Sequence, residues 1–181
     1  MEQHLLEQGM SVRVIENCLN GRRTMWDDPL LPGRNGLLGI GQVIEMHSPL
    51  SLLILMLGTN DFQSMHAHTA SHAAHGIIEI INAIRSAPVE PGMPIPQILL
   101  VSPPPIQKPR GSIAEKFQGA ETKNIGLADA YRKLAADMNC AYLHAGNIVT
   151  ASQVDGVHLD KDQHLLLGNA IATKVLTIQN L

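Results

Sequence analysis

Short apolar runs that end at turn residues dominate the hydrophobic pattern of this chain. The clearest run is Leu52–Leu57, which is followed at once by Gly58–Asp61. A continuous apolar run of this length, bounded by a turn, is typical of a strand buried on both faces of a parallel sheet. Further apolar runs predict strands at Val12–Ile15, Ile98–Val101 and Ala141–Leu143.

Between these runs the apolar residues recur at helical spacing. The longest such stretch is Thr69–Ser86, whose predicted inward stripe comprises Ala74, Ile77, Ile78, Ile81 and Ile84. A second helix, capped by Thr122, is predicted to turn inward Ile125, Tyr131, Leu134 and Met138. Shorter helices are predicted before Gly9, over Gln42–His47, and from Asp160 or Asp162 to about Ile178.

Strands that alternate with helices predict an α/β fold, a three-layer α/β/α sandwich around a parallel sheet. A chain of 181 residues suits a single domain, and aromatic residues are only 3% of it, so the predicted core is aliphatic. The net charge is −3 without a Lys/Arg cluster, which argues against nucleic-acid binding. No apolar run approaches the roughly 18 residues that span a membrane. Two cysteines without a C-x-x-C motif favour a reduced, cytoplasmic compartment.

Two groups of polar residues stand out against this scaffold. Asn60 follows the Leu52–Leu57 strand, at the strand end where open α/β sheets bind their ligands. Asp155 and His158 lie three residues apart near the end of the chain, a spacing that suits a general base and the carboxylate that orients it. Taken alone, the second pair is a weak signal, and an aspartate that caps a turn beside a surface histidine is the favoured interpretation.

These motifs together resemble the SGNH (GDSL-type) hydrolases. Gly58–Asp61 and Asp155–Leu159 are similar to the third and fifth sequence blocks of that family, and Asn20–Thr24 is similar to the second block. The loop that follows, with Asp27–Pro29 and Gly33–Gly36, points to the arylesterase and acyl-transferase branch. The resemblance extends from Val12 to the end of the chain.

The resemblance implies a flavodoxin-like strand order and a specific site. His158 would be the general base, Asp155 would orient it, and the backbone N–H of Gly21 and the side-chain amide of Asn60 would stabilise the oxyanion. The implied substrate is a small carboxylic ester, aryl or acetyl, which reacts through an acyl-enzyme. The implied chemistry needs no metal and no organic cofactor, and the branch implies a homo-oligomer.

The nucleophile is the missing part of the pattern. No Gly-Asp-Ser-Leu-like block precedes Gly21. The expectation is therefore that residues 1–181 form one SGNH hydrolase-like domain that is N-terminally incomplete, with its first strand missing and the serine upstream of residue 1. Two alternatives stay open. The chain is a nucleophile-less binding or scaffold protein of this fold, or an internal Ser102 or Cys18 has taken over. Ser102 is expected to bond local backbone, and Cys18 to be an inert buried residue.

Other polar residues permit a second interpretation. A helix would place on one face, opposite the isoleucine stripe, His68, His72 and His75. They could ligate a transition metal, but a solvated polar face is the favoured interpretation. Trp26 either lines a substrate pocket or anchors its loop. The loop arginines, including Arg23, are expected to pair with Asp27 and Asp28 rather than with an acidic substrate.

Overall fold

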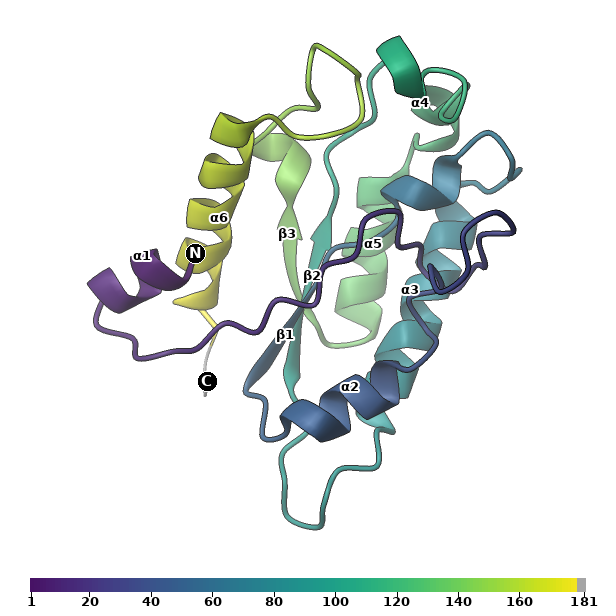
Figure 1. Cartoon of the computed structure of the whole chain (residues 1–181). Helices are drawn as coiled ribbons and strands as arrows, with labels where there is room; N and C mark the ends of the chain where they lie inside the picture. The colour runs from purple at the N-terminus through teal and green to yellow at the C-terminus, as the bar shows by residue number, and fades with distance from the viewer. Residues whose placement is uncertain (179–181) are drawn as a thin grey trace.

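The computed structural model describes residues 1–178, and it confirms the three-layer α/β/α arrangement (Figure 1). The elements in chain order are α1 Glu2–Glu7, α2 Ile40–His47, β1 Leu52–Leu55, the 3₁₀ helix η1 Thr59–Phe62, α3 Ala70–Arg85, β2 Gln97–Ser102, η2 Gly111–Ile113, α4 Ala120–Lys123, α5 Leu127–Asp137, β3 Ala141–His144, η3 Ala145–Asn147 and α6 Lys161–Val175. α1 and α6 cover one face of the sheet, and α2, α3 and α5 cover the other (Figure 1). Within residues 1–178, no helix has both the length and the apolar character needed to cross a membrane.

The central strand β2 contributes side chains to two hydrophobic cores, one on each face of the sheet. The sheet is parallel in the order β1-β2-β3. Ile98 and Leu100 of β2 pack with α3 and α5, while Leu99 and Val101 pack with α1 and α6, and all four are at most 5% exposed. Side chains alternate between the faces of a strand, so an unbroken apolar run is what a strand covered on both faces requires.

Two strand predictions differ from the structure. Val12–Ile15 is not a strand, because no strand among the described residues runs beside it to accept its backbone hydrogen bonds; the Val14 N–H bonds the Glu2 carboxylate instead. The Leu52–Leu57 run forms β1 only as far as Leu55, and Leu55 is its one buried residue. β1 lies at the edge of the described sheet, so burial on both faces is wrong for β1 and right for β2.

The helix predictions are confirmed at α3 and corrected at Thr122. Thr69 begins α3 as its N-cap, and the stripe is rotated slightly, since Ile80 is fully buried and Ile78 only partly. The helix predicted from Thr122 is two helices, α4 and α5, separated at Gly126 with φ 85°. Ile125 falls in this break and is 74% exposed, so its predicted inward orientation is wrong. Tyr131 and Leu134 do face the core, and Asp160 begins α6 as its N-cap.

Candidate active site

The predicted site residues lie at the carboxyl edge of the sheet. All described strands are parallel, so their carboxyl ends meet at one edge. Asn60 follows β1 in η1, and Asp155 and His158 lie in the loop between β3 and α6, above the strands in Figure 1. Loops at this edge are where α/β sheets assemble ligand sites.

Asp155 and His158 form the predicted pair. His158 Nδ1 lies 2.7 Å from Asp155 Oδ2. The other carboxylate oxygen, Oδ1, accepts the backbone N–H groups of Val157 at 2.8 Å and His158 at 2.9 Å. Burial raises the pKa of Asp155, but these N–H groups and His158 outweigh it and lower the pKa below its ordinary value. An ionised Asp155 fixes the ring orientation of His158, whose side chain is 59% exposed and open to a substrate.

The loop that carries the pair is anchored to the segment after β2. The carbonyl oxygen of Gly156 accepts the Gln107 N–H at 2.8 Å, and that of Asp155 accepts the Arg110 N–H at 2.9 Å. Gly156 has φ 80°, and a Cβ there would lie 2.5 Å from the carbonyl oxygen of Lys108. Only glycine permits this approach, so Gly156 fixes the position of the loop that carries His158.

Asn60 contacts the residue that follows Gly21. Asn60 Nδ2 donates to the carbonyl oxygen of Arg22 at 3.1 Å, which places the carboxamide against the turn that contains Gly21. Gly21 is buried and has φ 77°. The structure therefore brings Asn60 to the turn that contains Gly21 and Asp155 to His158, and within residues 1–178 no hydrogen bond joins these two groups.

The predicted arginine–carboxylate pairing is confirmed for Arg23. Its guanidinium is fully buried, donates to Asp28 Oδ2 at 2.8 Å and also contacts His66. Burial raises the pKa of Asp28, but backbone N–H groups and Arg23 together lower it below its ordinary value. Gln63, which the sequence patterns did not single out, is also fully buried and accepts from Arg23 at 2.7 Å. No local signal could have found it, because the contact spans 40 residues.

Asp61 anchors the same loop through hydrogen bonds from Thr24. It is fully buried, and its carboxylate accepts the hydroxyl of Thr24 at 2.6 Å and the Thr24 N–H at 3.2 Å. Burial raises the pKa of Asp61 to about 6, against the lowering effect of the Thr24 hydrogen bonds. Near neutral pH the ionised carboxylate ties the start of the Arg23–Gly36 loop to η1.

The raised pKa predicts a pH-dependent stability. Asp61 favours the folded state most when it is protonated, below pH 3.8, and this contribution is lost as pH rises through about 6. Relative to an Asp61→Asn variant, the wild type should lose on the order of 3 kcal/mol of unfolding free energy across this range and nothing further above it. Urea unfolding of both proteins from pH 4 to pH 8 measures the difference. His68, whose pKa burial lowers to about 4, contributes the opposite slope to both proteins and cancels. A difference that is constant with pH would contradict the burial cost assigned to Asp61.

Two of the histidines lie before α3 and stack with Trp26, whereas His72 and His75 on α3 are exposed, as predicted for a solvated polar face. Trp26 lies 4.4 Å from His68 between ring centroids, and His66 stacks on His68 at 4.7 Å with the planes 6° apart. His72 uses its Nδ1 to accept the Thr69 N–H at the start of α3. No group of three metal-ligating side chains converges within residues 1–178. Trp26 packs against these rings, which is the loop-anchor role.

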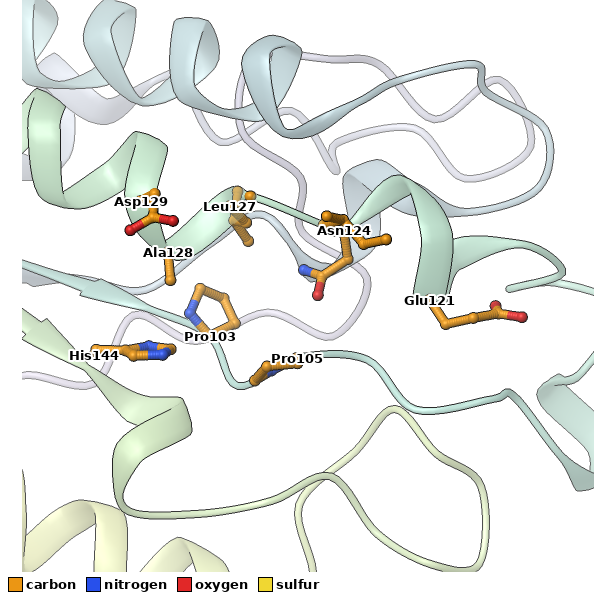
Figure 2. Close-up of a pocket in the computed structure, with 10 residues that line it drawn as sticks. Pro103, Pro105, Glu121, Asn124, Leu127, Ala128, Asp129 and His144 are labelled. Atoms are coloured by element: carbon orange, nitrogen blue, oxygen red, sulfur yellow. The ribbon is translucent and has the colours of Figure 1, made fainter.

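Neither internal nucleophile candidate contacts the His158 imidazole. Ser102 is fully buried, and its hydroxyl bonds the Tyr142 hydroxyl and His144 Nδ1, each at 2.9 Å, rather than the predicted backbone. Beside it lies a cavity of about 270 Å³, and Figure 2 shows the rings of Pro103 and His144 on its strand side. Cys18 is exposed, so its predicted burial is wrong.

Comparisons with known proteins agree with this fold. The pattern of the GDSL-like lipase/acylhydrolase family matches residues 2–166. The inhibitor-bound aryl esterase of M. smegmatis superposes with a TM-score of 0.88 at 34% identity, over 97% of this chain and 81% of that one. A carbohydrate acetylesterase from Sinorhizobium meliloti gives 0.87 at 32% identity, over 95% and 80%. A carbohydrate acetylesterase family member from the same organism gives 0.89 at 34% identity, over 99% and 86%. A comparison with curated proteins finds no match.

These matches define a hydrolase-type α/β sandwich. The chain belongs to the GDSL-like lipase/acylhydrolase family, and the resemblance to SGNH hydrolases is confirmed.

Proposed function

We propose that this chain is an esterase that acts on small aryl or acetyl carboxylic esters. Two features at the carboxyl ends of the strands carry the proposal. One is the imidazole of His158, oriented by Asp155, and the other is the side-chain amide of Asn60 beside the Gly21 turn. The similar structures are an aryl esterase and carbohydrate acetylesterases, which favours the same substrate class.

In the proposed reaction the ester carbonyl lies against the Asn60 side-chain NH₂ and the Gly21 N–H. Attack on the carbonyl carbon moves negative charge to its oxygen, where these donors stabilise it. His158 takes the proton of the attacking hydroxyl and returns it to the leaving alcohol, while the Asp155 carboxylate stabilises the imidazolium. A serine upstream of residue 1 is the proposed nucleophile; it forms an acyl-enzyme that water or an alcohol then resolves.

Self-association stays a prediction. The loop before α2 exposes apolar side chains that suit it, with Leu30 79% and Leu38 68% exposed.

Hydrolysis of p-nitrophenyl acetate by the 181-residue chain tests the proposal. Without the serine, His158 can act as general base on a water molecule while Asn60 and Gly21 stabilise the oxyanion, so we expect a slow rate above buffer. The rate should collapse in His158→Ala and in Asn60→Ala, and should rise further when an upstream serine segment is joined to the chain.

His164→Ala is the matched control, because His164 is an exposed histidine in the first turn of α6. It should hydrolyse the ester at the wild-type rate. Equal rates in wild type, His158→Ala and buffer would refute an esterase within this chain. Saturable acetate binding without turnover would then indicate the nucleophile-less binding protein.

A further inference from the structure

A chain of donors and acceptors links the buried Arg23 to Asn60. Arg23 Nη2 donates to Gln63 Oε1 at 2.7 Å, and Gln63 Nε2 donates to Asn60 Oδ1 at 2.9 Å. Asn60 Nδ2 then donates to the carbonyl oxygen of Arg22 at 3.1 Å. Arg23 and Gln63 are both 0% exposed, so water does not compete for these bonds.

Because arginine can only donate, the donor and the acceptor are fixed in each hydrogen bond of this series. A guanidinium carries only donors, so Gln63 must turn its oxygen toward Arg23 and its NH₂ toward Asn60. Asn60 must then turn its oxygen toward Gln63. We propose that Arg23 is a positioning residue which, through Gln63, orients the Asn60 carboxamide so that its NH₂ faces the position of the substrate oxyanion. The inference rests on the esterase function proposed above.

The direction matters because a carboxamide has nearly the same shape when its oxygen and nitrogen are exchanged. A reversed Asn60 would place oxygen lone pairs against the developing negative charge and would remove a donor from the transition state. Arg23 is itself held in place by a buried carboxylate. Asp28 holds Arg23 with Oδ2 at 2.8 Å, while its Oδ1 accepts the N–H groups of Leu30 at 2.9 Å and Leu31 at 3.0 Å.

Gln63→Glu tests the direction with almost no change of shape. The new carboxylate still accepts from Arg23, but it cannot donate to Asn60 Oδ1, and the two oxygens would repel at 2.9 Å. Because a hydrogen bond to a carboxylate is stronger than one to a carbonyl oxygen, Asn60 should turn its NH₂ toward position 63 and give up its bond to the Arg22 carbonyl. We expect kcat for p-nitrophenyl acetate to fall about 100- to 1,000-fold, as for loss of one oxyanion donor, with KM little changed. Gln118→Glu, on the exposed surface, adds the same charge and should leave kcat unchanged.

Arg23→Lys is the complementary variant. An ammonium also only donates, so Gln63 and Asn60 should keep their directions, although the planar fork of the guanidinium is lost. We expect this variant to be less stable in urea than the wild type and to keep kcat within a few-fold. Arg23→Lys should thus lose stability while retaining kcat, whereas Gln63→Glu should lose kcat while remaining folded by circular dichroism. If the network had only a structural role, stability and kcat would fall together in both variants.

The orientation itself can be read by NMR without activity. In ¹⁵N-labelled wild type the Asn60 side-chain NH₂ should show NOEs to Arg23 Hα, which lies on the same side of the trans peptide as the Arg22 carbonyl oxygen. In Gln63→Glu these should be replaced by NOEs to the side chain at position 63. Wild-type NOEs retained in Gln63→Glu would overturn the inference. Absence of His158-dependent hydrolysis in the wild type would instead overturn the esterase proposal, and the NOE comparison would still decide the role of Arg23.

Discussion

Arg23→Met is expected to lower the free energy of unfolding by about 3–5 kcal/mol, the cost of removing one partner from a buried ion pair. Arg23 is fully buried and donates to Asp28 at 2.8 Å and to Gln63 at 2.7 Å. Methionine fills much of the volume of the side chain but donates nothing. The Asp28 carboxylate, only 6% exposed, would lose its ion-pair partner and keep only Lys116 and backbone N–H groups to offset its charge.

The adjacent arginine is the control for this change. Arg22 reaches out to Asn17, with its Nη1 2.7 Å from the Asn17 carbonyl oxygen at an exposed position. Arg22→Met should therefore change the unfolding free energy by less than about 1 kcal/mol, as for other surface charges. Urea unfolding of the two variants beside the wild type measures both values. A loss for Arg23→Met no greater than that for Arg22→Met would show that the buried pair contributes no stability.

The contact between Asp155 and His158 could be predicted from the sequence because its geometry is local. Asp155 and His158 are three residues apart, and a single turn around Gly156 brings them to 2.7 Å. Asn60 could be placed because it follows an apolar strand, whose carboxyl end fixes its position in any parallel sheet. In both cases short-range sequence carries the information.

The features that could not be predicted depend on neighbours distant in sequence. The apolar runs of β1 and β2 are alike, yet only β2 has a strand on each side, so burial differs between them. The ring stack and the Arg23–Gln63–Asn60 chain join segments about 40 residues apart. Strand periodicity and motif spacing describe residues that are close in sequence, so they cannot predict contacts between distant segments. The packing of the Arg23–Gly36 loop on α3 was missed for the same reason.

Gly76→Ala tests that packing, and we expect it to destabilise the fold although alanine is the better helix former. A Cβ at Gly76 would lie 2.1 Å from Thr24 Oγ1 and 2.6 Å from Thr24 Cβ. Thr24 cannot retreat without breaking its hydrogen bonds to the buried Asp61. Overpacking and the strained hydrogen bonds should together exceed the helix gain of about 1 kcal/mol, for a net loss of about 2–4 kcal/mol.

Gly168→Ala is the matched change in α6, where the added Cβ would meet only the Met1 nitrogen at 3.6 Å. It carries the same helix gain without the clash, so its unfolding free energy should rise by up to about 1 kcal/mol. Opposite signs in the two variants, measured by urea unfolding, would show that α3 gives up helix propensity at Gly76 to let the Thr24 segment dock. Because Thr24 directly follows Arg22 and Arg23 in the turn against Asn60, Gly76→Ala should also lower the His158-dependent esterase rate, whereas Gly168→Ala should not. Stabilisation by both alanines would mean that the loop is free to move away from α3, and the Gly21 turn would then lack the fixed support that an oxyanion donor requires.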